Sequence, residues 1–278
     1  MRTRILLIAA PLAMVASAAL VVPSGLTLNP SAPAATLAAV HDRTALHLLE
    51  LALDLLGWLA LTTAGLTLAA SAAVRLADSP PTGGLTRAAS AAVRPAEPSP
   101  TGVSPPDTPV CRGGASGTPT ESGLPAAVYA GQWVAESPSR GRAAGDAAVR
   151  AVVAGGLLAA AGVAGVLHDA GNLAVTQLAG RAGEPGVIGA ATAVMLVAKW
   201  GVNLAGLLWT AATLVAAGGR WTGLVVGAFG LAAVVLPWTA GAAGASPALE
   251  QVGYLLHVPV MAWWALRPAA GAGGRMAG

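Results

Sequence analysis

The feature that most restricts the fold of this chain is a series of long apolar segments. They occupy residues 5–22, 44–74, 150–176, 187–217, 221–240 and 248–266. Because an α-helix rises about 1.5 Å per residue, about 20 consecutive apolar residues are enough to cross the hydrocarbon core of a bilayer. The sequence therefore predicts an all-α fold, a polytopic transmembrane helical bundle with six spans.

The composition also points to a membrane environment. Hydrophobic residues make up 55% of the 278 residues and charged residues only 10%, whereas soluble proteins average about 25% charged residues. The lipid bilayer is thus the expected main partner. The arginines are scattered beside the apolar segments without a dense basic run, so we expect no binding of nucleic acid. Fourteen arginines against one lysine, with abundant Ala, Gly and Pro, favour a bacterial source.

The first apolar segment has two interpretations. It follows Arg2 and Arg4, which suit either a signal peptide or a first membrane anchor, and Ala-Ser-Ala at residues 16–18 offers a cleavage site. The apolar run continues beyond this site and totals 18 residues, about the minimum for a span. Retention gives six spans, whereas cleavage gives five and changes no later orientation.

One long stretch has a different character. Residues 77–148 contain 11 of the 20 prolines, and their composition cannot bury a core, so a disordered Pro/Ser/Gly-rich linker is expected. The single cysteine, Cys111, lies there and excludes an intrachain disulfide. The predicted parts are an N-terminal transmembrane segment or signal peptide, an outer loop with the second transmembrane helix, the linker, a four-helix transmembrane region and a short flexible tail, over residues 1–22, 23–76, 77–148, 149–267 and 268–278.

The distribution of the arginines predicts an orientation. If the N-terminus is cytoplasmic, 12 of the 14 arginines lie on the cytoplasmic side and only Arg43 and Arg181 lie outside. Positive residues favour the cytoplasmic side of membrane proteins. We therefore predict a cell-membrane protein whose two termini and linker are cytoplasmic.

Three polar residues form a stripe at the start of the second apolar segment. His47, Glu50 and Asp54 are spaced i, i+3 and i+7, which places them on one face of a helix. Imidazole and carboxylates at this spacing can share a proton or a divalent ion, so one interpretation is a proton relay or a partial metal site. The other is an amphipathic segment over residues 41–54 at the outer interface, with the span beginning at Leu55.

A second polar group, His168, Asp169 and Asn172, occurs late in the third apolar segment. His168 and Asn172 lie one turn apart on a shared face, at a depth similar to that of the first stripe. Either these residues face a polar site inside the bundle, or the helix ends at Val166 or Leu167 and they are solvated.

Lys199 is the only lysine and the deepest charge in the apolar segments, and Asn203 follows it by one turn. A lysine at the bilayer centre costs about 2.5–3.5 kcal/mol, so it is expected to face the bundle or a wet cavity. Two roles are considered. One is a structural ion pair with Glu50, Asp54 or Asp169, and the other is a functional charge that binds an anion or changes its protonation.

His257 lies in the last apolar segment, preceded by Gln251 and Tyr254 at three-residue spacing. A hydrogen-bonded packing residue is the simplest interpretation. With His47 and His168 it makes three histidines on three helices, which leaves a haem or metal protein as a remote alternative. No spacing motif supports that alternative, so no metal or cofactor is expected.

Gly223 and Gly227 form a G-x-x-x-G pattern, which predicts close packing of the fifth helix against a neighbour. The chain contains no nucleophile elbow, no H-E-x-x-H and no Walker motif, so nothing in it indicates an enzyme.

The leading functional hypothesis is a protein that moves or senses a small solute or proton through a polar intramembrane cavity, because polar groups within a membrane are costly and usually functional. The alternative is a structural or accessory subunit, as a homo-oligomer or bound through its linker to a cytoplasmic protein partner. The two hypotheses differ in whether the polar residues converge in one cavity.

Overall fold

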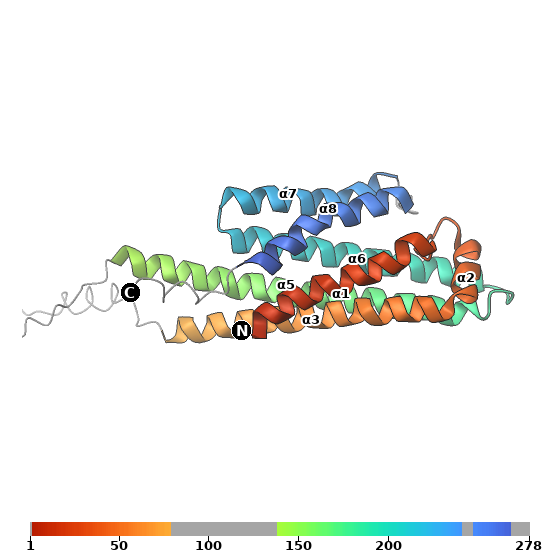
Figure 1. Ribbon diagram of the computed structural model, residues 1–278, viewed down its shortest axis with the longest axis horizontal. Helices are drawn as coiled ribbons and strands as arrows, with labels where there is room; N and C mark the ends of the chain where they lie inside the picture. The colour runs from red at the N-terminus through yellow and green to blue at the C-terminus, as the bar shows by residue number, and fades with distance from the viewer. Residues whose placement is uncertain (1, 79–137, 241–246, 268–278) are drawn as a thin grey trace, which may run out of the picture. The chain divides into compact units, whose positions relative to one another are not determined.

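The computed structural model describes residues 2–78, 138–240 and 247–267, and the regular elements within these ranges are all helices (Figure 1). They are α1 (Arg2–Ser24), α2 (Pro33–Asp42), α3 (Thr44–Ala77), α5 (Pro138–Ala179), α6 (Val187–Ala217), α7 (Trp221–Val235), the short 3-10 helix η1 (Leu236–Ala240) and α8 (Pro247–Leu266). Apart from the first turn of α5, they belong to one compact unit of the chain. Most of the predicted linker and the C-terminal tail lie outside the described residues, although α5 begins within the range predicted as linker.

Five helices are long and apolar enough to cross a membrane. These candidate spans are Thr3–Ser24, Thr44–Ala77, Ala143–Ala179, Val187–Ala217 and Trp221–Thr239. Large apolar side chains on these helices are more than half exposed, among them Leu56, Leu167 and Val197. Such apolar surfaces are suited to contact with lipid. The all-helical prediction is therefore confirmed, and five of the six predicted segments meet the requirements for a span.

The sixth predicted span is a helix of a different kind. Residues 248–266 fall within α8, but α8 is not among the helices that are apolar enough to cross a membrane. Glu250, Gln251 and His257 lower its mean hydropathy. Five of the six predicted spans are thus supported, and the sixth predicted span is a helix with polar residues on one side.

One helix was not predicted. α2 lies in the region expected to be an outer loop, and Pro33 stands at its start, where the fixed φ of proline suits the first helical position. Its side chains Leu37 and Val40 are fully buried in an apolar cluster with Val175 of α5 and Met195 of α6. α2 therefore covers the end of the bundle at which α3 and α6 begin (Figure 1).

Glycines allow α3 and α5 to approach closely. A Cβ atom at Gly65 would lie 2.6 Å from the carbonyl oxygen of Gly155, and a Cβ atom at Gly155 would lie 2.6 Å from the carbonyl oxygen of Gly65. Both distances are shorter than van der Waals contact, so glycine is required on both helices at this crossing. The approach also brings the polar residues of α3 toward those of α5.

The remaining helices pack around this pair. Gly223 and Gly227 lie on the side of α7 that faces α6, where added Cβ atoms would meet Ala217 and Leu214. α7 in turn contacts α8, while α1 lies along α3 and also contacts α8 (Figure 1). The arrangement leaves polar side chains of α3, α5, α6 and α8 in the interior.

Replacing Gly155 with valine is expected to separate α3 from α5 and to lower the free energy of unfolding by about 1–3 kcal/mol, the usual range for overpacking. Gly156→Val is the matched control, because a Cβ atom at Gly156 would meet nothing within 4 Å. Thermal unfolding of the detergent-purified protein, followed by tryptophan fluorescence, measures both variants. Equal melting temperatures for the two would contradict the close approach.

Candidate functional site

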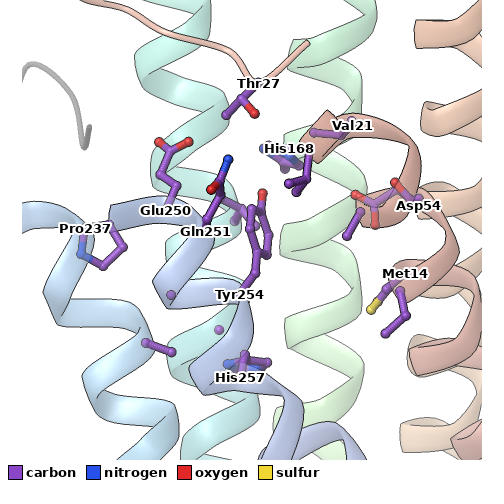
Figure 2. A pocket seen from close by; sticks show the side chains of 18 of the residues that line it. Met14, Val21, Thr27, Asp54, His168, Pro237, Glu250, Gln251, Tyr254 and His257 are labelled. Atoms are coloured by element: carbon purple, nitrogen blue, oxygen red, sulfur yellow. The ribbon is translucent and has the colours of Figure 1, made fainter. Parts of the chain in front are cut away.

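A cavity of about 570 Å³ lies among α1, α3, α5, α6, α7 and α8 (Figure 2). Its ionisable and amide side chains come from four of these helices: His47, Glu50, Asp54, His168, Asn172, Lys199, Asn203, Glu250, Gln251, Tyr254 and His257. Eight of the nine residues predicted for the polar cluster are among them, and the ninth, Asp169, lies outside the lining. Helices far apart in the sequence thus direct their polar residues to one place.

α1 and the segment after it give the cavity a mainly apolar part of its lining. α1 contributes Met14 and Val21, and the segment that follows contributes Leu26 and Thr27. In Figure 2 Met14 and Val21 lie beside Asp54, across the cavity from the polar side chains of α8.

The stripe on α3 faces the interior. His47 is 1% exposed, and its Nδ1 atom lies 2.9 Å from Oε2 of Glu50. The indole N–H of Trp58 donates a hydrogen bond of 3.1 Å to Oδ2 of Asp54. α2 ends at Asp42, and residues 44–54 belong to the same helix as the apolar stretch, α3. That the span itself begins at Leu55 stays a prediction.

His168 links α5 to α6. Its Nδ1 atom donates to the carbonyl oxygen of Ala198 at 2.8 Å, and the side-chain amide of Asn172 donates to its Nε2 atom at 2.9 Å. A carbonyl oxygen can only accept, so Nδ1 carries a proton. A Cβ atom at Gly201 would lie 3.3 Å from the backbone nitrogen of His168, which shows how closely α6 approaches.

The alternative in which this helix ends at Val166 or Leu167 is also wrong. α5 continues to Ala179, and both Asp169 and Asn172 are about 5% exposed or less. These two residues are thus buried within the helix bundle and are not solvated beyond a helix end.

Lys199 pairs with a residue that was not among its predicted partners. Its Nζ atom forms an ion pair with Oε1 of Glu250 in the first turn of α8, and both side chains are nearly buried. The predicted pairing with Glu50, Asp54 or Asp169 is therefore wrong.

The helical spacing of the polar residues in the last apolar segment could have identified Glu250 as a cavity residue. Glu250, Tyr254 and His257 follow a spacing of four and three residues, which places them on one helix face, as in the α3 stripe. In Figure 2 these side chains follow one side of α8, with His168 and Asp54 across the cavity.

His257 lies against aromatic rings. Its ring packs edge-on against Trp209 with 5.3 Å between centroids, and Trp209 packs edge-on against Trp58 at 6.3 Å. Edge-to-face contacts of this kind stabilise an aromatic cluster. The three rings connect α8, α6 and α3 at the cavity.

Asp169 lies beside Asp54. It is 5% exposed, and its side chain is within hydrogen-bond reach of the Asp54 carboxyl group. One of its oxygens lies within 4.8 Å of ligand atoms of both Asp54 and His168, which are themselves within this distance of each other. Two carboxylates and an imidazole therefore converge in the wall of the cavity.

The five apolar spans and the buried polar cavity define the class of protein: a multi-pass helical membrane protein. Comparison of the sequence with family models, with curated proteins and with solved structures finds no match. The functional argument consequently depends on the geometry of the cavity.

A charged pair outside the spans provides a contrast. Arg181 and Glu184 form an exposed ion pair in the turn between α5 and α6, with the Nε atom of Arg181 2.8 Å from Oε1 of Glu184. This hydrogen bond holds the pKa of the Glu184 carboxyl below its ordinary value. Because the pair is exposed, water screens both charges.

Breaking the Lys199–Glu250 pair is expected to destabilise the protein strongly. Lys199→Met leaves a nearly buried carboxylate unpaired and Glu250→Gln leaves the ammonium unpaired, each lowering the free energy of unfolding by about 3–5 kcal/mol. The double variant should recover most of this loss. Unfolding of the two single variants and the double variant forms a double-mutant cycle, with Glu184→Gln as a control of little effect. Additive losses would contradict the ion pair.

The cavity is expected to admit water. In a Cys111→Ser background, Asn203→Cys places a thiol in the cavity wall, whereas Leu204→Cys places one at the neighbouring residue, whose side chain is 50% exposed on the outer surface. A membrane-impermeant methanethiosulfonate reagent should modify only the first in lipid vesicles, since the reactive thiolate forms in water. If Asn203→Cys stays unmodified, as Leu204→Cys is expected to, the cavity is closed to water.

Proposed function

We propose that this protein moves protons, alone or together with a small polar solute, through the cavity. The observation that supports the proposal is the convergence of ionisable side chains from four helices on one cavity. Such groups are costly within a membrane and are typical of proton and solute pathways.

Neighbouring groups in the cavity are close enough to exchange a proton. His47 and Glu50 are in direct hydrogen-bond contact at 2.9 Å. Asp54, His168 and Asp169 bring ligand atoms within 4.8 Å of one another, a separation that one water molecule can bridge. A proton could thus pass between α3 and α5 through short steps.

The Lys199–Glu250 pair has a supporting role in this proposal. It places two opposite charges in the cavity wall without adding net charge, which keeps the cavity polar at a lower electrostatic cost than either charge alone. The pair also holds the polar side of α8 toward α6.

The proposed orientation follows from the arginines, with both termini and the linker in the cytoplasm. His47, Glu50 and Asp54 lie in the first part of α3, which begins beside α2, and this end of the bundle is then the outer side (Figure 1). The accessory-subunit hypothesis depends on linker residues that lie outside the described ranges. A haem has less support, because no spacing motif for its ligands occurs in the sequence.

Proton flux into proteoliposomes tests the proposal. With a pH-sensitive dye inside the vesicles and an imposed potassium diffusion potential, the wild-type protein should acidify the lumen faster than protein-free vesicles do. Asp54→Asn should abolish most of this flux, because it removes a proton acceptor from the cavity. Asp42→Asn, at an exposed position at the end of α2, is the matched control. Flux equal to that of protein-free vesicles, or flux unaffected by Asp54→Asn, would overturn the proposal.

A further inference from the structure

We propose that Asp54, His168 and Asp169 bind one divalent transition-metal ion, of the class of Zn²⁺ or Mn²⁺, in the wall of the cavity. One ligand atom from each of the three side chains lies within 4.8 Å of the other two. The inference rests on the proposed function and extends it. Asp54 is a proton acceptor in that function and a metal ligand here, and the metal ion is the proposed solute.

Two carboxyl groups meet beside one imidazole in the interior of the bundle. Asp169 is 5% exposed, and its side chain lies within hydrogen-bond reach of the Asp54 carboxyl group, so the two can share a proton. The ion pairs in the described part of the chain join His47 to Glu50, Arg181 to Glu184 and Lys199 to Glu250, so none involves Asp54 or Asp169. A divalent cation would replace the shared proton and balance the charge of both carboxylates.

The donor set favours a transition metal. Two carboxylate oxygens and one imidazole nitrogen suit Zn²⁺ and Mn²⁺, whereas Ca²⁺ and Mg²⁺ prefer oxygen ligands alone. Ligand distances of about 2.0–2.2 Å require the three groups to draw together. Side-chain rotation can supply this movement, because the three atoms already share one small region.

His168 is oriented as a metal ligand would be. Its Nδ1–H donates to the carbonyl oxygen of Ala198, which fixes the ring and leaves the lone pair of Nε2 to accept. Metal-binding histidines commonly have such a backbone partner on the other nitrogen. Nε2 now accepts from the side-chain amide of Asn172, so a metal ion would take the place of this donor.

The cavity provides the path to the site. Asp54 and His168 line the cavity, whereas Asp169 is outside its lining and within 4.8 Å of both. An ion entering from the cavity would first meet Asp54 and His168 and would then be enclosed by Asp169.

Zinc binding to the detergent-purified, chelator-treated protein tests this inference without any transport assay. In a Cys111→Ser background, isothermal titration and elemental analysis should find one Zn²⁺ per chain, and Zn²⁺ should raise the melting temperature. Asp169→Asn, which keeps the shape of the side chain, should weaken binding at least about tenfold and remove the thermal shift. Asp42→Asn should change neither. If Asp169→Asn fails to fold, His168→Gln replaces it.

Two results would overturn the inference. One is the absence of stoichiometric Zn²⁺ binding by the wild type, and the other is equal binding by the wild type and the site variants. Proton flux that is lost in Asp54→Asn without any Zn²⁺ binding would contradict the metal site and leave the proposed function standing. Zn²⁺ binding without proton flux would contradict the proposed function and leave the metal site standing.

Discussion

The contact between Lys199 and Glu250 joins the middle of α6 to the first turn of α8. A lysine within an apolar helix requires a partner, and here the partner comes from α8, which is not among the candidate spans. α8 carries Glu250, Gln251, Tyr254 and His257 on its cavity side. The polar side of α8 faces polar residues of α3, α5 and α6. α8 can therefore pack in the bundle although its mean hydropathy is too low for a candidate span.

The same requirement explains how the other polar groups are arranged. His47 has Glu50, Asp54 has the indole of Trp58, and His168 has Ala198 and Asn172. Three of these hydrogen bonds each lie within one helix, and the fourth, from His168 to Ala198, joins α5 to α6. Gly201 makes the close approach of these two helices sterically available. Asp169 adjoins Asp54 and His168.

The sequence predicted those features that depend on local properties of the chain. Apolar length identified five spans, and helical spacing placed His47, Glu50 and Asp54 on one face. α2 was missed because it is short, and its stability comes from burying Leu37 and Val40 against distant residues.

The partner of Lys199 was predicted incorrectly for a related reason. Periodicity assigns residues to a face of their own helix, but the pairing of two faces depends on how the helices rotate and pack against each other. The sequence alone did not show whether the polar residues meet in one cavity. The packing of α3, α5, α6 and α8 brings them together. α1 adds one consequence. Cleavage after residue 18 would remove Met14 and Ser17 from the lining of the cavity and leave Val21 and Leu26 in it. The processing of the N-terminus would therefore change which side chains enclose the cavity on the side of α1.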